Sequence, residues 1–587
     1  MTSCILLSRQ LSFRALIHTS CVRLDSLTNI PMTGSKLRAR GCSITPAHRI
    51  IRCPYPDIEI PRIPITELVW GRIAQWQDKP ALTCGVTGRR YTYAEARDVA
   101  HRFGAALLNQ GFKKGDLVAL CLPNVPEYPL IFLGTLEAGL SLTAINTHYS
   151  EEKISSLLVS SSPKVIVTTP ELIVKVRKAA KDVPSCHTFI TVANSSDEHP
   201  QGCLSFSQFV EQKTGFDSVK FPDINPNDLA VIPYTNGTTG PAKGVKLSHF
   251  NLVANVRQIT HEAFDQGRDA TESFQEVIVV VVPMSHIFGM VVVMLARMCL
   301  GTHIITVPNP DPKIYIKCLS EHKSTVLGLT TSLMFYLASF RTLPYDLLGD
   351  VHTVMYGGSP IASDNVATFM ARLKPSVVFQ QGYGMTETTS AVTQTSRWER
   401  KLGTCGYLVP NTQAKVIDTE TGVALGSGHI GEILVKGPQV MMGYLNNEAA
   451  QMNKFDEEGW LITGDLGFYD DEHCFHIVDR LDDLIHVTVM HTLPVAPAEI
   501  EELLRAHPGV AEAAVVGVKD PEAGEVPRAF VVRRPTFYRL TEQELLDLIV
   551  QKLPPYKRLS GGVKFVDSLP KTPTGNVQRF HLKENSN

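Results

Sequence analysis

The chain has 587 residues, which exceeds what one hydrophobic core normally fills, so we expect at least two domains. Hydrophobic residues make up 44% and charged residues 19%, with a formal net charge of -2, a balance that is typical of a soluble globular protein. The composition has no excess of basic residues, so it does not indicate a nucleic-acid partner.

Cysteine usage and apolar runs exclude two further classes. The twelve cysteines include no C-x-x-C pair and no Cys/His cluster, which predicts reduced thiols in an intracellular compartment and no zinc site. The apolar runs 277–282 and 288–296 are shorter than the roughly 20 residues that span a bilayer. We therefore expect no transmembrane segment.

The N-terminus has the composition of a targeting segment. Arg9, Arg14 and Arg23 lie among serines and threonines, and no acidic residue precedes Asp25. Such a composition is typical of a mitochondrial transit peptide. We expect residues 1–40 to be a transit peptide or, alternatively, a disordered tail, and we expect a location in the mitochondrial matrix, with the cytoplasm as the alternative.

Regular structure begins beyond residue 60. Thr92 begins a capping box and a helical repeat, and residues 117–122 then form a continuous apolar run. The unit repeats when Ser150 caps a second helix that leads to the apolar residues 165–167. Helices that alternate with fully apolar strands predict an α/β fold with mostly parallel sheets covered by helices. We expect this architecture throughout a large domain of residues 50–480.

A small α+β domain is predicted for residues 483–587. A helix at 498–507 precedes two paired strands at 513–518 and 528–532, and a second helix covers 541–553. This module is too short for another doubly wound sheet.

Residues 234–245, YTNGTTGPAKGV, have the composition of a phosphate-binding loop. They follow the apolar strand 229–233 and precede Ser248, which can cap a helix. Glycines expose backbone N–H groups, threonines add hydroxyls, and Lys243 adds a cation. The second glycine and the metal-binding hydroxyl that a P-loop has beside its lysine are both missing here. A flexible surface turn is the alternative.

Further motifs follow in a fixed order. Residues 356–360, YGGSP, and 381–387, QGYGMTE, each begin where a strand is expected to end, which is where open parallel sheets bind ligands. Residues 460–465, WLITGD, and then Asp479 and Arg480, complete the series. From about residue 54 to 579 the chain resembles the adenylate-forming (AMP-binding) superfamily, in its acyl-CoA synthetase branch, and most of all 4-coumarate:CoA ligases.

The resemblance implies a nucleotide site. In it Tyr383 would stack on the adenine ring, Asp465 would accept from the ribose hydroxyls, and Arg480 would reach the ribose or phosphates. The full ATP-binding set that it implies is Thr235, Gly237, Thr238, Thr239, Gly240, Lys243, Gly358, Ser359, Gln381, Gly382, Tyr383, Asp465 and Arg480. Four further residues match structural positions of the family and are assigned no chemical role: Gly431, Glu432, Gly443 and Tyr444.

The resemblance also implies catalytic residues. Thr386 would contact the α-phosphate, and Glu387 would hold magnesium. His286, in residues 283–289, would form part of the wall or gate of the acyl pocket. The alternatives are a core aromatic at Tyr383, a solvated charge at Glu387 and a hydrogen-bonded core histidine at His286.

These parts imply a reaction in two halves, with ATP, Mg²⁺ and coenzyme A. The oxygen of a small-molecule carboxylic acid attacks the α-phosphorus of ATP, and the thiol of coenzyme A then displaces AMP. Such catalysis rests on positioning and charge stabilisation. The small domain would rotate between the halves about a hinge that matches Asp482.

Two departures from the family fall in the small domain. Asn576 stands where the family has a lysine that bridges the carboxylate and the α-phosphate, and an amide carries no charge. Losing one such group costs about 10²- to 10³-fold in rate. Lys571 is near in sequence but would substitute only if its loop refolded. Residues 486–494 are longer than the family turn beside the coenzyme A tunnel and contain no glycine.

The leading hypothesis is an acyl-CoA ligase for an aromatic acid or a medium-chain fatty acid, with a weakened adenylation step. A nucleotide- or acyl-binding pseudoenzyme is the alternative from another class, and a luciferase-like oxygenase shares every motif. The sequence identifies neither the acid nor the oligomeric state.

Overall fold

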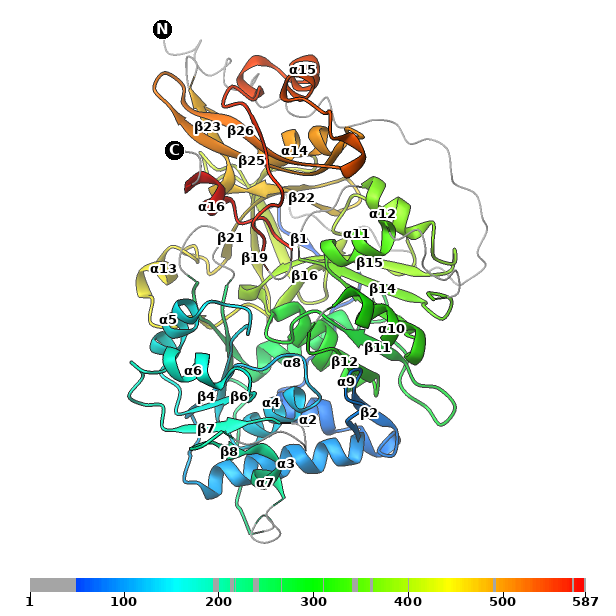
Figure 1. The fold of residues 1–587 in the computed structure, drawn as a ribbon, viewed down its shortest axis with the longest axis vertical. Coiled ribbons are helices and arrows are strands. Elements are labelled where there is room, and N and C mark those ends of the chain that lie inside the picture. The colour runs from blue at the N-terminus through cyan, green and yellow to red at the C-terminus, as the bar shows by residue number, and fades with distance from the viewer. Residues whose placement is uncertain are drawn as a thin grey trace. The chain divides into compact units, whose positions relative to one another are not determined.

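The computed structural model describes most of the chain after residue 48 (Figure 1). The predicted transit segment, residues 1–40, lies outside the described residues. Within the described part, no helix combines the length and the apolar composition that a membrane crossing requires. The described residues are 49–193, 200–211, 216, 218–235, 242–264, 267–309, 311–339, 347–358, 363–399, 401–488, 492–572 and 575–584.

An eight-stranded sheet has the order β20-β10-β9-β5-β4-β6-β7-β8. Its six strands from β9 to β8 run parallel, whereas β10 and β20 are antiparallel additions at one edge. The strands are β4 (Leu117–Leu120), β5 (Ser141–Ala144), β6 (Val165–Thr168), β7 (Thr188–Thr191), β8 (Leu204–Ser205), β9 (Leu229–Pro233), β10 (Val245–Ser248) and β20 (Gly443–Tyr444).

A nine-stranded sheet has the order β17-β16-β15-β14-β13-β11-β12-β2-β3. Its central strands are parallel, and β3, β16 and β17 run antiparallel at the two edges. The strands are β2 (Pro80–Cys84), β3 (Arg90–Thr92), β11 (Val277–Val280), β12 (His303–Thr306), β13 (Val326–Leu329), β14 (Thr353–Gly357), β15 (Val378–Met385), β16 (Ser390–Gln394) and β17 (Tyr407–Leu408).

Helices cover both large sheets (Figure 1). Several of them begin at side-chain caps that the sequence predicts. Thr92 forms the expected capping box at α3, and Ser150 caps α5. A continuous core joins the layers and includes Phe103 of α3, Phe132 of α4 and Leu142 of β5, each fully buried. The helices before residue 400 are α2 (Ile65–Trp70), α3 (Tyr93–Asn109), α4 (Glu127–Glu137), α5 (Glu151–Ser161), α6 (Ile173–Ala179), α7 (Phe206–Val210), α8 (His249–Ile259), α9 (Ala296–Cys299), α10 (Pro312–His322), α11 (Thr331–Ser339) and α12 (Ser363–Met370).

The parallel architecture ends earlier than the sequence predicts. A five-stranded sheet of order β1-β18-β19-β21-β22 is antiparallel throughout, so the expectation of parallel sheet up to about residue 480 was wrong. Strands β21 and β22 are joined by residues 470–474 alone, whereas a parallel pair needs a crossover of a dozen or more residues. The strands are β1 (Ile51–Arg52), β18 (Gln413–Ile417), β19 (Gly431–Lys436), β21 (Leu461–Tyr469) and β22 (Phe475–Arg480), and α13 (Glu448–Met452) precedes β21.

The last hundred residues form the predicted α+β module. The long strands β25 and β26 pair antiparallel with Ala514 opposite Phe530, and β27 adds a parallel strand. Thr541 forms the capping box of α15. The elements are β23 (Ile485–Thr488), β24 (Thr492–Val495), α14 (Pro497–Arg505), β25 (Val510–Asp520), β26 (Gly524–Arg533), α15 (Glu542–Lys552), β27 (Val563–Phe565) and α16 (Arg579–Glu584).

Candidate active site

The Gly/Thr loop closes a hairpin between β9 and β10. The Thr235 N–H donates to the carbonyl of Lys243, and the Lys243 N–H donates to Thr235 Oγ1, each over 3.0 Å. A short strand that the sequence did not predict, β10, separates the loop from helix α8, and Ser248 caps that helix as predicted. The hydroxyl of Thr235 therefore joins the two ends of the loop through its hydrogen bond with Lys243. The loop residues Gly237, Thr238, Thr239 and Gly240 lie outside the described residues, as does Ser359.

Strand β20 brings a tyrosine to this hairpin. Tyr444 pairs with Val245 in β10, and Nζ of Lys243 lies 5.4 Å from the centre of the Tyr444 ring. The Tyr444 hydroxyl donates to Oε1 of Glu387 over 2.7 Å. The family resemblance implied only a packing role for Tyr444, whereas the structure places it against the predicted metal ligand.

Glu387 lies on a tight turn between β15 and β16. Thr386 and Glu387 belong to a single 3₁₀ turn, and the Glu387 side chain is only 8% exposed. Thr389 and Ser390, which follow this turn, have φ angles of 55° and 115°, which L side chains rarely adopt. Strained backbone of this kind clusters at functional sites, and here it follows a buried carboxylate.

A second group gathers around Asp465 of β21. The Tyr383 hydroxyl donates to Asp465 Oδ2 over 2.7 Å, and Arg480 Nε lies 3.1 Å from Oδ1 in an ion pair. Arg480 is the direct partner of Asp465 in the β21–β22 register. Burial raises the pKa of Asp465, and the Arg480 charge and the Tyr383 hydroxyl oppose that rise. The structure thus brings together all three of these predicted ribose and adenine residues.

The glycine-bearing motifs lie side by side on β14 and β15. Gly358 follows β14 with a φ of +99°, and a Cβ built there meets no atom within 4 Å. In β15, Gln381 pairs with Tyr356 and Gly382 pairs with Gly357. The expectation that residues 381–387 begin where a strand ends was wrong, because β15 continues to Met385. The open space over Gly358 suits a flat ligand that lies against backbone.

His286 lies just before a π-helix, Phe288–Leu295, that packs on α8. The Phe288 N–H donates to its Nδ1 over 3.3 Å, which leaves the proton on Nε2. Loss of hydration lowers the pKa of His286 to about 4. The side chain is therefore neutral at physiological pH.

The small domain fixes the residue that departs from the family. Asn576 exchanges two hydrogen bonds with Thr572: its N–H donates to Thr572 Oγ1 over 3.1 Å, and its carbonyl accepts from the Thr572 N–H over 2.8 Å. Nζ of Lys571 forms a 2.6 Å ion pair with Glu512 of β25. Lys571 is therefore engaged elsewhere in this structure.

The altered segment 486–494 is a hairpin rather than a wide turn. Strands β23 and β24 pair with His486 opposite Pro494 and Thr488 opposite Thr492, and the tip, 489–491, lies outside the described residues. Asp482, the expected hinge, lies in a 3₁₀ turn at Leu481–Asp483 that directly precedes β23.

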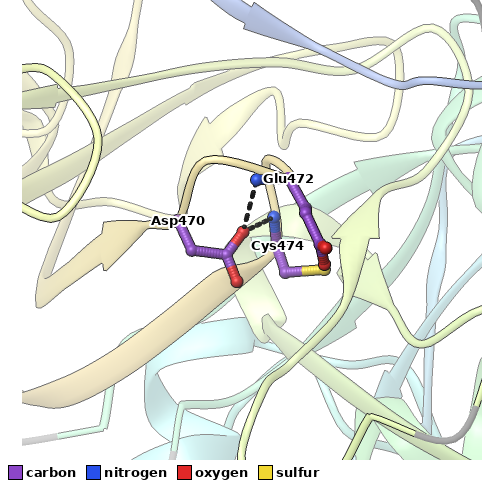
Figure 2. A group of neighbouring side chains, drawn as sticks. All are labelled: Asp470, Glu472 and Cys474. Carbon is purple, nitrogen blue, oxygen red and sulfur yellow. Dashed lines mark hydrogen bonds between the residues drawn. The ribbon is translucent and has the colours of Figure 1, made fainter. Parts of the chain in front are cut away.

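Asp470, Glu472 and Cys474 form a compact group in the β21–β22 turn (Figure 2). Asp470 Oδ1 accepts from the backbone N–H groups of Glu472 and Cys474 over 3.0 and 2.9 Å. Nζ of Lys401 lies 2.6 Å from both carboxylates. Because a lysine already supplies the positive charge, this group is a turn with its counter-ion and does not require a metal.

Sequence comparisons identify a family for each of the two domains. Residues 69–445 match the AMP-binding enzyme family, and residues 499–576 match the AMP-binding enzyme C-terminal domain. The chain is 34% identical over 543 residues to 4-coumarate–CoA ligase 3 of Oryza sativa subsp. japonica, covering 91% of this chain and 94% of that ligase. It is 35% identical over 543 residues to a probable 4-coumarate–CoA ligase 3 of Dictyostelium discoideum, covering 91% and 97%.

Solved structures give the same result. ATP-bound MatB from Rhodopseudomonas palustris superposes with a TM-score of 0.79 at 28% identity, covering 89% of this chain and 99% of that one. The two-domain α/β fold is therefore that of the adenylate-forming enzymes. The chain belongs to the AMP-binding enzyme family, and within that family it is similar to the 4-coumarate–CoA ligases.

Proposed function

We propose that the protein is an ATP-dependent acyl-CoA ligase that forms an acyl adenylate and then a coenzyme A thioester. The observation that carries the proposal is the convergence of two buried carboxylates: Glu387, held by Tyr444, and Asp465, held by Tyr383 and Arg480. The similarity to 4-coumarate–CoA ligases and to an ATP-bound relative supports the same assignment.

In the first half-reaction an oxygen of the substrate carboxylate forms a bond to the α-phosphorus of ATP. The bond between the α-phosphorus and the oxygen that bridges the α- and β-phosphates breaks, and its electron pair leaves with pyrophosphate. In the second half-reaction the coenzyme A sulfur attacks the acyl carbon, AMP leaves, and the thiol proton passes to solvent. The protein supplies positioning and charge rather than a nucleophile.

The donor set around Glu387 fits a magnesium ion. Mg²⁺ is usually held by one or two carboxylates together with substrate phosphates. The Tyr444 hydroxyl occupies Oε1 of Glu387, which orients Oε2 as the remaining ligand atom. Magnesium would neutralise phosphate charge here, and Thr386 on the same turn would contact the α-phosphate.

We further propose that the substrate is an aromatic or medium-chain carboxylic acid. His286 precedes an apolar π-helix and is neutral, so it suits the wall of a pocket for an uncharged acyl tail. His286 also retains an Nε2–H donor for a substituent on that tail.

Adenylation is expected to be slow because Asn576 carries no charge and Lys571 is paired with Glu512. The test is acyl-adenylate formation by Asn576→Lys beside the matched control Asn576→Gln. We expect the lysine variant to gain about 10²-fold or more and the glutamine variant to stay near wild type. Equal rates in all three proteins would contradict a weakened step at this position.

Asn576 also favours a second candidate, a pseudoenzyme that binds a nucleotide or an acyl group without turnover. This candidate predicts ATP binding without any product in the wild-type protein. A luciferase-like oxygenase predicts oxygen consumption that depends on the acyl adenylate.

We propose the mitochondrial matrix as the location, with the cytoplasm as the alternative. The support is the arginine-rich, acid-free composition of residues 1–24. A fluorescent fusion of residues 1–40 should co-localise with mitochondria, and a diffuse cytosolic signal would refute the proposal.

A further inference from the structure

Lys454 is a cation that no motif assigns, and it lies on a rigid connection between α13 and β21. Its N–H donates to the carbonyl of Gln451 over 3.0 Å, and its carbonyl accepts from the Ile462 N–H over 2.9 Å. Two backbone hydrogen bonds therefore fix where the side chain starts.

The Lys454 side chain points to the backbone that carries Asp465. Nζ donates to the carbonyl of Thr463 over 3.1 Å, and Thr463 lies two residues before Asp465. Nη2 of Arg480 approaches the same carbonyl at 3.5 Å. Two cations thus share one neutral acceptor, which concentrates positive charge at this edge of the site.

The charges that act on Lys454 are those of the predicted active site. Burial lowers its pKa most, the carboxylates of Glu387 and Asp465 oppose that shift, and the charges of Arg480 and Lys243 add to it. The ammonium is therefore within electrostatic range of the expected metal ligand, the ribose residue and the loop lysine.

This arrangement differs from an ordinary structural ion pair. Among the described residues, the bonded partner of the Lys454 ammonium is a backbone carbonyl, whereas Lys415 of β18 binds Asp456 directly over 3.0 Å. An ammonium has three donors, and the Thr463 carbonyl uses one of them. The remaining donors are available to an anion, which would also oppose the effect of burial on the pKa of the ammonium.

We propose that Lys454 binds the β- and γ-phosphates of ATP and so supplies, from the large domain, positive charge that Asn576 does not supply from the small domain. This inference rests on the proposed function and names a further residue of that site. Lys454 transfers no proton: it stabilises the negative charge that pyrophosphate gains as its bond to the α-phosphorus breaks.

The first test measures binding of ATP and of AMP by calorimetry, without acid or coenzyme A, to wild type and to Lys454→Met. We expect the variant to bind ATP at least about tenfold more weakly, since a charge-assisted contact to phosphate is lost, and to bind AMP within about twofold of wild type. Equal weakening of both ligands, or of neither, would overturn the proposal.

Two further variants separate charge from folding. Lys454→Arg keeps the charge and should restore most of the ATP affinity. Lys436→Met is the matched control, because Nζ of Lys436 also donates to a backbone carbonyl, that of Glu458, over 3.0 Å but away from the two carboxylates. If Lys454→Met melts at a much lower temperature than wild type, Lys454→Arg becomes the deciding variant. A folded Lys454→Arg protein that does not recover the ATP affinity would overturn the proposal.

A second readout links Lys454 to position 576. Asn576→Lys should raise adenylate formation by a larger factor in the Lys454→Met background than in wild type. In wild type Lys454 already supplies part of the positive charge, whereas in Lys454→Met the new lysine has to supply all of it. Identical factors in both backgrounds would contradict shared compensation. If wild type forms no adenylate with any acid, the proposed function fails, yet the comparison of ATP with AMP still tests Lys454.

Discussion

The hydroxyl of Tyr444 donates a 2.7 Å hydrogen bond to Oε1 of Glu387, although 57 positions separate the two residues in the chain. The bond joins the β20 edge of one sheet to the β15–β16 turn of another. It therefore couples the base of the Gly/Thr loop to the residue that is expected to hold magnesium.

Tyr444→Phe should raise the magnesium concentration needed for half-maximal pyrophosphate release roughly tenfold, because Oε1 of Glu387 loses the donor that orients the carboxylate. The melting temperature should change little, since the ring remains. Tyr91→Phe is the matched control: Tyr91 donates to Glu127 over 2.7 Å outside the site. An unchanged magnesium requirement in Tyr444→Phe would contradict the role given to this bond.

Gly358→Ala should weaken nucleotide binding and cost on the order of 1 kcal/mol in stability, because the φ of +99° suits glycine alone. Its new methyl group would also enter the open space beside β14. Gly88→Ala provides the control, since Gly88 has a φ of +74° and open space too, but lies in the β2–β3 turn. Binding of AMP to both variants checks this: equal affinities would show that Gly358 lines no nucleotide site.

Acid should destabilise the protein partly through His249, which is 1% exposed and accepts from the Ile65 N–H. Burial lowers its pKa from 6.5 to about 4. Below pH 6.5 the unfolded chain therefore binds a proton that the folded chain does not, and the free energy of unfolding falls until about pH 4. The loss at pH 5 is about 2 kcal/mol.

Denaturant unfolding of His249→Gln between pH 7 and pH 5 checks that sign. The variant should lose less stability over this range than wild type, and His429→Gln, at an exposed site, should follow wild type. A His249→Gln curve parallel to that of wild type would exclude this histidine as the cause.

Arg579→Gln should destabilise the small domain by about 3 kcal/mol or more. Arg579 contacts Asp483 over 3.2 Å and Glu501 over 2.7 Å, and both carboxylates are nearly buried. Removing the guanidinium takes the closest cation away from both carboxylates and leaves Glu501 with the longer contact to Arg505. Limited proteolysis should cut the variant early in the small domain, while Arg505→Gln, whose contact with Glu501 is a longer 3.8 Å, should resist like wild type.

Local signals in the sequence predicted much of the fold. The predicted caps at Thr92, Ser150 and Ser248 each begin a helix, because a side-chain acceptor for the first free N–H groups is a property of neighbouring residues. The apolar strands of the parallel sheets were recognised because a run of apolar residues is also a property of neighbouring residues. The antiparallel course of β18 to β22 was missed, because strand direction depends on pairing with distant segments.

The site residues likewise fall into those that a local sequence pattern identifies and those that only the structure identifies. Glycine and carboxylate positions were assigned through the family motifs, and the structure brings Tyr383, Asp465 and Arg480 together. Tyr444 and Lys454 were not assigned, since their importance comes from contacts across separate sheets and turns rather than from a local pattern. Only folded geometry reveals such residues.

The most direct test of the account is product formation by the purified wild-type protein with ATP, magnesium and a panel of aromatic and medium-chain acids, with and without coenzyme A. We expect acyl adenylate and pyrophosphate without coenzyme A, and an acyl-CoA thioester with AMP when it is present. ATP binding with neither adenylate nor thioester from any acid would contradict a ligase and favour the pseudoenzyme.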